Sequence, residues 1–286
     1  MRRIGRAILA LLATGFACVA YLYLTLPDVR GLRTANPETT AFMDLRAREA
    51  RDRGEPPRHV QKWVSYPRIS QHLKRAVLVA EDSAFWTHEG VDYDQLKESI
   101  EANIERMEFA RGGSTITQQL AKNLYLSPSK NPIRKLRELL IARQLETELS
   151  KQRILELYLN VIEWGNGIYG AEAAARTYFQ KSAADLSPQE SALLAGAIIN
   201  PRALDPGHPT GRLLRRQQMV MRRMGAVTPP PVVAGPVPVP EPSQEAPGEP
   251  VPQLPDAVGV PATLPGEVLP ESKGEGGKPP GGDRKP

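Results

Sequence analysis

Three short segments of the chain carry side chains whose types and spacing suit catalytic chemistry. In the first segment, Glu81 and Asp82 stand side by side after an apolar run. A carboxylate at the end of a buried helix is partly desolvated, which raises its pKa and suits a general base. Neighbours on a helix point about 100° apart, so we expect the two carboxylates to do different jobs. The alternative is a solvated helix end, with His88 as an ordinary turn residue.

The second segment places small hydroxyl residues at a predicted helix start. Ser114 and Thr115 follow two glycines, and Gln119 and Lys122 come three residues apart on one helical face. Backbone N–H groups at a helix N-terminus favour an anion, so this segment suits a phosphate or a sugar. The spacing of a nucleotide-binding P-loop is absent. The alternative is an ordinary capped amphipathic helix.

The third segment is basic and contains a lysine and a glutamate at helical spacing. Lys135 and Glu138 lie three residues apart on one predicted helical face, and Lys130 precedes them. A lysine beside a carboxylate keeps it ionised and positions it. The alternative is a surface ion pair worth about 0.2–0.5 kcal/mol.

The elements that must position these segments are mostly helices. The pattern of apolar residues predicts an all-α fold, or very nearly so, over residues 37–225. Helices are expected at 38–53, 72–80, 93–107, 115–125, 133–149, 151–159, 169–179, 187–199 and 210–224. Val60–Tyr66 alternates enough to be a strand.

Caps and glycines mark where these helices begin and end. Asn36-Pro37 is expected to cap the first of them, Ser70 the next and Ser114 a later one. Gly165, Gly167 and Gly170 are expected to form a flexible loop. Several glycines close together also let the backbone approach a ligand.

The N-terminus predicts a single membrane anchor. Ala7–Leu26 runs for twenty residues without a charge and follows Arg2, Arg3 and Arg6. Twenty helical residues span about 30 Å, the thickness of the hydrocarbon core. Because arginines favour the cytoplasmic side, we expect everything after Pro27 to lie outside. The alternative is a cleaved signal peptide, whose apolar core is usually about 7–15 residues long.

The C-terminal part has a composition that does not support a packed core. Seventeen of the 28 prolines lie between Pro229 and Pro286, in a stretch without Trp, Phe, Tyr, Ile or Met. Such a segment buries too little apolar surface to offset the entropy of ordering, so we expect disorder. The run Pro-Val-Pro-Val-Pro at 236–240 suits docking as polyproline II, and the alternative is a solvated spacer.

Charge and cysteine usage narrow the function classes. Residues 228–286 carry four basic and eight acidic side chains, which leaves 33 basic and 24 acidic groups in residues 1–227. A basic globular part suggests a polyanionic partner such as nucleic acid, phospholipid headgroups or a phosphorylated substrate. Cys18 is the single cysteine, which excludes disulfide scaffolds and thiolate metal clusters.

Taken in order, these segments resemble the glycosyltransferase family that polymerises peptidoglycan. Five motifs carry the resemblance: Glu-Asp-x-x-Phe-x-x-His-x-Gly at 81–90, Gly-x-Ser-Thr-Ile-x-Gln-Gln-x-x-Lys-Asn at 112–123, Arg-Lys-x-x-Glu at 134–138, and two further motifs at 154–160 and 173–179. The resemblance implies a lysozyme-like helical glycosyltransferase domain at 27–226. It would lie between a cytoplasmic N-terminus at 1–6 with a transmembrane signal-anchor helix at 7–26, and a Pro-rich disordered tail at 227–286.

The resemblance also implies a reaction and its residues. The lipid-linked glycan chain would be transferred, with inversion, onto the GlcNAc 4-hydroxyl of lipid II, releasing polyprenyl diphosphate. Glu81 would be the catalytic base and Glu138 a second catalytic glutamate, while Lys122 and Lys130 would hold the diphosphate. Other substrate-binding positions are Ser114, Thr115, Gln119 and Lys135, and the residues that shape the loop around Glu81 are Asp82, Phe85 and His88.

Cofactors, partners and location follow from the same resemblance. No cofactor is required, and any Mg²⁺ or Mn²⁺ would bridge the substrate diphosphate and a carboxylate. The expected partners are lipid II, the nascent glycan strand, the membrane and proteins of cell division or elongation, but not nucleic acid. The expected location is the bacterial inner membrane, with the catalytic domain on the periplasmic side.

The sequence is also compatible with a second class of enzyme and with a non-catalytic function. The tail contains no Ser-x-x-Lys motif, so we expect glycan polymerisation without transpeptidase activity. The alternative enzyme is a lytic transglycosylase or muramidase, which needs one glutamate and no diphosphate-binding lysines. A third reading is a non-catalytic scaffold that recruits partners through its tail.

Overall fold

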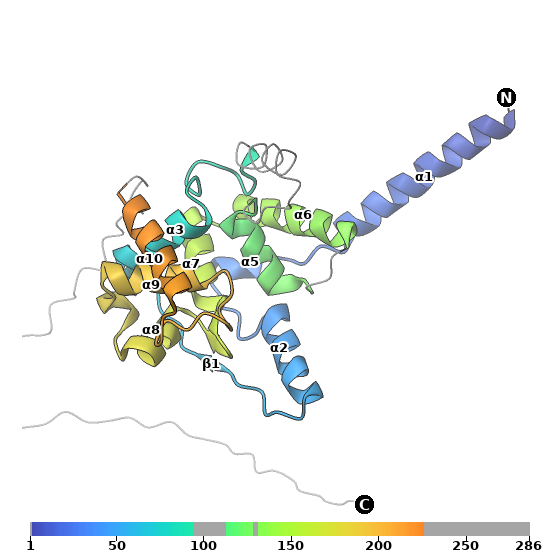
Figure 1. Ribbon diagram of the computed structural model, residues 1–286. Helices are drawn as coiled ribbons and strands as arrows, with labels where there is room; N and C mark the ends of the chain where they lie inside the picture. The colour runs from blue at the N-terminus through green and yellow to red at the C-terminus, as the bar shows by residue number, and fades with distance from the viewer. Residues whose placement is uncertain (1, 94–112, 128–130, 226–286) are drawn as a thin grey trace, which may run out of the picture. The chain divides into compact units, whose positions relative to one another are not determined.

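The computed structural model describes residues 2–93, 113–127 and 131–225, and helices dominate it (Figure 1). The predicted, mostly helical class is confirmed. The α-helices are α1 (Arg2–Leu24), α2 (Ala41–Asp52), α3 (Gln71–Glu81), α5 (Ile116–Tyr125), α6 (Pro132–Glu148), α7 (Lys151–Val161), α8 (Ala171–Phe179), α9 (Pro188–Ala197) and α10 (Gly211–Arg223). Short 3-10 helices are η1 (Arg30–Arg33), η2 (Tyr66–Arg68) and η3 (Ala183–Asp185). The described residues belong to one compact unit, Met1–Val237.

Several helices begin where a hydroxyl side chain can cap them. The Ser70 hydroxyl accepts from the His72 N–H at the start of α3, and the Thr210 hydroxyl accepts from the Leu213 N–H at the start of α10. Ser187 forms a full capping box with Glu190 at the start of α9. Each cap satisfies backbone N–H groups that have no partner within the helix.

Two predicted caps are wrong by a few residues. Helix α2 begins after Thr40, not at Asn36-Pro37, because the Thr40 hydroxyl accepts from the Met43 N–H at 3.1 Å. Helix α5 is capped by Thr115 and not by Ser114. In both places a threonine nearer the helix supplies the acceptor that the N-terminal N–H groups need.

A small sheet replaces part of the expected loop structure. Its strands are β1 (Val60–Gln61), β2 (Glu163–Gly165) and β3 (Ile168–Tyr169), in the order β1-β3-β2. Strand β1 pairs parallel to β3, with Val60 opposite Ile168, and β2 pairs antiparallel to β3. The predicted strand over residues 60–66 is therefore only two residues long.

The glycines expected to form a flexible loop instead allow close packing within the protein. A Cβ atom on Gly170 would lie 2.8 Å from the Asn160 carbonyl oxygen, and one on Gly165 would lie 1.9 Å from the Tyr178 hydroxyl. Gly167 has φ +66°, a conformation that side chains other than glycine rarely adopt. These glycines therefore let β2 and β3 turn tightly against their neighbours.

The core positions the ends of α3 and α5. Leu73, Val77 and Leu78 of α3 are fully buried, as are Ile116 and Leu120 of α5. Helix α10 contacts both α9 and α3, and α5 contacts α6 and α7 (Figure 1). Because α3 is packed on most of its surface, its last residue has a fixed position.

Some predictions concern segments outside the described residues. The expected helix at 93–107 lies almost wholly outside the described residues, as does the tail at 227–286. Among the described residues, no helix has both the length and the apolarity needed to cross a membrane. The anchor at 7–26 therefore stays a prediction.

Candidate active site

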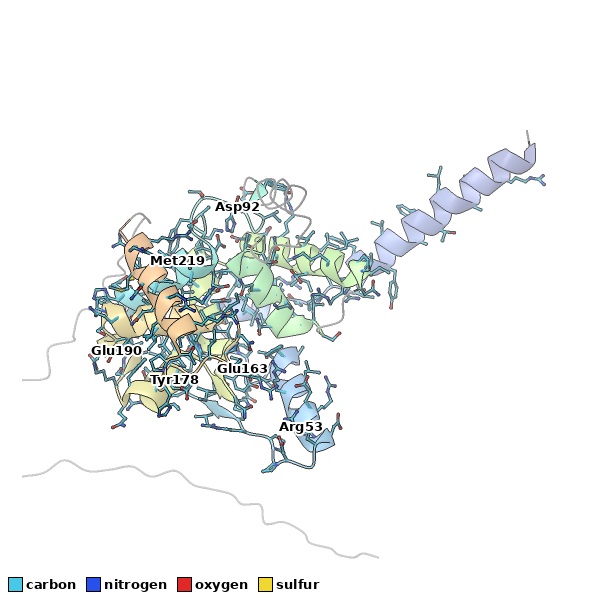
Figure 2. The ribbon with its side chains drawn as sticks, in the orientation of Figure 1. Arg53, Asp92, Glu163, Tyr178, Glu190 and Met219 are labelled. Carbon is cyan, nitrogen blue, oxygen red and sulfur yellow. The ribbon has the colours of Figure 1, made fainter. Side chains whose placement is uncertain are left out.

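A cleft of about 530 Å³ opens at the end of α3. The start of α5, the residues after α9 and one face of α10 complete it. Predicted site residues that line it are Glu81, Asp82, Ser114, Gln119 and Lys122. Figure 2 labels Met219, which lies on the α10 wall of this cleft. The fold therefore gathers residues of the first two sequence segments into one cavity.

Glu81 is held in the cleft by a two-step hydrogen-bond chain. The Gln119 side-chain amide donates to Oε2 of Glu81 at 2.8 Å, and the Tyr158 hydroxyl donates to Oε1 of Gln119 at 2.9 Å. Tyr158 is fully buried, so it fixes the orientation of the Gln119 amide. The carboxylate is thereby aimed by a residue of α5 and one of α7.

The surroundings of Glu81 raise its pKa. Burial is the largest cause, since it disfavours the charged carboxylate. The hydrogen bond from Gln119 and the positive charges of Arg216 and Lys122 oppose this effect without cancelling it. A carboxylate with a raised pKa is a stronger base than an ordinary glutamate, which is what proton abstraction requires.

Asp82 also lines the cleft, but protein donors bind its carboxylate. Its side chain is buried, and its Oδ2 atom accepts from the Ile116 N–H at 2.8 Å. Nε2 of His88 lies 2.9 Å from the same oxygen, and the Gly90 N–H donates to Nδ1 of His88 at 3.0 Å. The carboxylate therefore joins the end of α3 to the positive start of α5 and to the intervening loop.

Phe85 completes the support of that loop. It is fully buried, with its ring centroid 5.1 Å from Trp86 and 6.1 Å from His88 in edge-on arrangements. The Lys151 ammonium lies 4.6 Å from the Phe85 ring centroid. These contacts hold the loop that follows Glu81.

Thr115 does not lie among the described residues that line the cleft. It is buried, and its hydroxyl donates to the Gly90 carbonyl oxygen at 2.7 Å while accepting from the Gln118 N–H. The structure places this predicted substrate-binding residue behind the cleft, because its side chain caps α5 and ties down the loop. Ser114, one residue earlier, reaches the cleft.

The third of the sequence segments, which contains Lys135 and Glu138, contacts the second segment at Ser114 and Gln118. The Lys135 ammonium donates to the Ser114 hydroxyl at 3.3 Å and to Oε1 of Gln118 at 3.0 Å, and it forms an ion pair with Glu138. Arg134 pairs with the other oxygen of Glu138 at 2.8 Å. Glu138 is buried, so this pair of cations compensates its charge within the protein.

Lys122 brings a positive charge to the cleft, close to Glu81. Burial lowers the pKa of Lys122, and the negative charge of Glu138 opposes that effect. Glu138 thus stabilises the protonated ammonium although it does not line the cleft. The charges of both predicted glutamates, Glu81 and Glu138, therefore act on the Lys122 ammonium.

The wall of the cleft that α10 forms was not predicted from the sequence. Arg216, Met219 and Arg223 line the cleft from this helix. Their spacing of three and four residues puts them on one helical face, and this spacing can be seen in the sequence. The sequence does not show which arginines face a cleft, because α10 also carries Arg212, Arg215 and Arg222. The Arg216 guanidinium is anchored by its Nε, which donates to the Gly196 carbonyl oxygen at 2.9 Å.

The described residues offer no group of three or more His, Cys, Asp or Glu side chains that could hold a metal ion. Asp82 and Glu138 already bind protein donors, so neither is free to act as a ligand. Lys130 lies outside the described residues, and its assignment stays a prediction.

Comparisons with known proteins agree with this geometry. Residues 50–225 match the transglycosylase family. The chain is 49% identical over 191 residues to the biosynthetic peptidoglycan transglycosylase of Dechloromonas aromatica, covering 67% of this chain and 83% of that protein. It is 46% identical over 229 residues to the protein of the same name from Chromobacterium violaceum, covering 79% and 99%. The chain therefore belongs to the transglycosylase family.

Proposed function

We propose that this chain is a peptidoglycan glycosyltransferase that polymerises glycan strands. The observation that carries the proposal is the Glu81 carboxylate, which Gln119 holds in a cleft with the Lys122 ammonium nearby. The printed names of the relatives support the same activity. The substrate class is lipid II together with the growing lipid-linked strand.

In the proposed reaction, Glu81 removes the proton from the GlcNAc 4-hydroxyl of lipid II. The resulting oxygen attacks C1 of the lipid-linked chain from the opposite face to the leaving group, so the configuration inverts. The bond between C1 and the diphosphate oxygen breaks, and the electron pair leaves with polyprenyl diphosphate. Lys122 stabilises the negative charge that develops on this leaving group.

The supporting residues keep this arrangement ready before substrate binds. Gln119 aims the Glu81 carboxylate, and Asp82 holds the end of α3 to the start of α5. Glu138 favours the charged form of Lys122 from inside the protein. Preorganised charges cost no rearrangement during the reaction, which is why they lower its barrier.

The proposed location is the outer face of the bacterial inner membrane, with the chain anchored by α1. The uncharged run Ala7–Leu26 supports this location. Leu9, Leu12 and Phe16 are 68%, 64% and 77% exposed, so an apolar surface on α1 is open to a surrounding phase. Lipid would cover that surface. Partner proteins of cell division or elongation remain a prediction.

The test is glycan synthesis by the purified full chain in detergent with labelled lipid II. Glu81→Gln keeps the side-chain shape but accepts no proton, so we expect the rate to fall by about 10²–10⁴-fold. Glu89→Gln is the matched control, because Glu89 is exposed in the same segment and lies outside the cleft lining.

Polymer made by the wild type and by Glu89→Gln should be degraded by a muramidase. A Glu81→Gln enzyme with wild-type rate and an intact helical fold would contradict the assigned base. Cleavage of preformed glycan by the wild type, with no polymer formed from lipid II, would instead favour a lytic enzyme.

A further inference from the structure

A second cavity of about 560 Å³ shares no lining residue with the catalytic cleft. The segment before β1, the β2–β3 turn, the end of α8 and the connection between α9 and α10 form it. Tyr178 lines this cavity and Met219 lines the cleft, and Figure 2 shows the two labels well apart. The described part of the chain therefore has two cavities of similar volume on different parts of its surface.

The walls of this second cavity are built by close packing. A Cβ atom on Gly165 would lie 1.9 Å from the Tyr178 hydroxyl, and one on Gly167 would lie 2.4 Å from the Arg58 carbonyl oxygen. The Tyr178 hydroxyl donates to the Trp164 carbonyl oxygen at 3.2 Å. Burial raises the pKa of Tyr178 to about 12, so it stays a donor. The aromatic wall is therefore fixed before any ligand binds.

Two arginines, Arg58 and Arg202, and one carboxylate, Asp205, line the cavity, so the lining has a net positive charge. The Arg58 side chain is exposed, and no ion pair or hydrogen bond joins it to another described residue. Arg202 has a long ion pair, 3.7 Å to Glu49. The Asp205 carboxylate is occupied, since it accepts from the Gly207 N–H at 2.7 Å and lies 3.1 Å from Nδ1 of His208. An anionic group would find a free guanidinium here.

The remaining polar lining suits a saccharide. Asn166, Thr177 and Gln180 are exposed around the half-buried Tyr178 ring. Amides and hydroxyls of this kind donate to and accept from sugar hydroxyls, and the face of a tyrosine packs against the C–H face of a sugar ring. A smaller cavity of about 40 Å³ shares Arg58, Asn166 and Arg202, so the groove is elongated.

We propose that this cavity binds a segment of the product glycan strand, with Arg58 paired to a carboxylate of a peptide stem. The proposal rests on the proposed function, because that function makes a polymer of amino sugars that carries peptide carboxylates. A strand held here stays attached to the enzyme between additions. Such a site lengthens the strands without changing the chemistry in the cleft.

The first experiment measures binding of a preformed ligand. Uncross-linked glycan oligomers that carry their peptides are titrated calorimetrically into the full chain in detergent. We expect Arg58→Gln to weaken binding about fivefold or more, the loss expected for one charge-assisted contact. Arg51→Gln is the matched control, because Arg51 is also exposed but lines neither cavity, and it should bind as the wild type does.

A second variant and a second ligand show whether binding occurs in this cavity and depends on the peptide carboxylate. Thr177→Trp fills the cavity from an exposed position and should also weaken binding. Glycan stripped of its peptides should bind equally well to the wild type and to Arg58→Gln, since the carboxylate is gone. Equal affinity of the wild type, Arg58→Gln and Thr177→Trp for the peptide-bearing glycan would overturn the proposal.

The second experiment separates this site from the catalytic one. With lipid II, Arg58→Gln should keep the initial rate of the wild type but release shorter strands. Strands of wild-type length would overturn the proposal. A wild type that binds preformed glycan through Arg58 but makes no polymer would contradict the proposed function and leave the binding site standing.

Discussion

Glu81 and Asp82 are neighbours in the sequence, yet the fold gives them opposite surroundings. Both residues line the cleft, where the Glu81 carboxylate accepts a hydrogen bond from Gln119. Asp82 is buried and receives the Ile116 N–H. The helical turn between adjacent residues separates the two carboxylates, so Asp82 binds the start of α5 whereas Glu81 binds a side chain within the cleft. At the scale of the residue, the site depends on this division.

Arg216 gives a test of the electrostatics at the same scale. Its charge lowers the pKa of Glu81 against the effect of burial. We expect Arg216→Gln to raise that pKa further, so the acid limb of the pH–rate profile moves to higher pH, because the base must be ionised to act. Arg215→Gln is the control, since Arg215 is exposed on the same helix and lies outside the cleft lining. Identical profiles for both variants would contradict this role of Arg216.

At the scale of the element, the junction between α3 and α5 is the part that the chemistry needs most. Asp82 accepts from the Ile116 N–H and lies beside His88, and Thr115 ties the same loop through Gly90. One buried carboxylate thereby sets the direction in which α3 ends. A helix that frayed here would lose the aim of Glu81.

Asp82→Asn tests that junction. The amide keeps the shape but loses the charge-assisted bonds, so we expect the free energy of unfolding to fall by about 1–3 kcal/mol, with reduced activity. The measurement is the midpoint of chemical denaturation. Asp52→Asn, at an exposed position, should change it little. Wild-type stability combined with lost activity would instead place Asp82 in direct contact with substrate.

At the scale of the whole molecule, the interior holds a lysine without a carboxylate partner among the described residues. Lys74 is fully buried, its ammonium donates to the Tyr66 carbonyl oxygen at 3.1 Å, and it lies 4.1 Å from the Tyr66 ring centroid. Burial lowers the pKa of Lys74 from 10.5 to about 8. The folded chain therefore gives up this proton more readily than the unfolded chain does.

This difference makes stability depend on pH in a defined window. Between pH 8 and 10.5 the unfolded state binds more protons at Lys74, so its contribution to stability increases as pH rises and is smallest below pH 8. We expect Lys74→Met to lose this increase. Denaturation midpoints of both proteins at several pH values measure it, with Lys62→Met as the exposed control. A Lys74→Met protein with the wild-type pH dependence would contradict the assignment.

The contribution of the Pro-rich C-terminal tail is also a question about the whole molecule. Removal of residues 228–286 should leave polymerisation by the full remaining chain at the wild-type rate, because the cleft residues all precede Val227. Glycan synthesis from lipid II measures the rate of the shortened chain beside that of the full chain. Loss of activity with an intact fold would favour the scaffold reading, in which the tail is the functional part.

Much of the helical framework could be predicted from local signals. Apolar periodicity and the Ser70 cap placed most described helices to within a few residues, because capping and one-sided burial depend on nearby sequence. The strands β2 and β3 were missed. Their pairing depends on the close approach of Tyr178 and Arg58 to Gly165 and Gly167, which periodicity does not reveal.

Residue types and the order of the motifs can be read from the sequence, and they identify the family. Which side chains share the cleft depends on how the helices pack. The packing brings Arg216 of α10 into the cleft with Glu81, leaves Thr115 outside the cleft lining and lets the charge of Glu138 act on Lys122. The physical reason is that helical spacing fixes which residues share a face, whereas long-range packing of α10 on α9 and α3 fixes what that face meets.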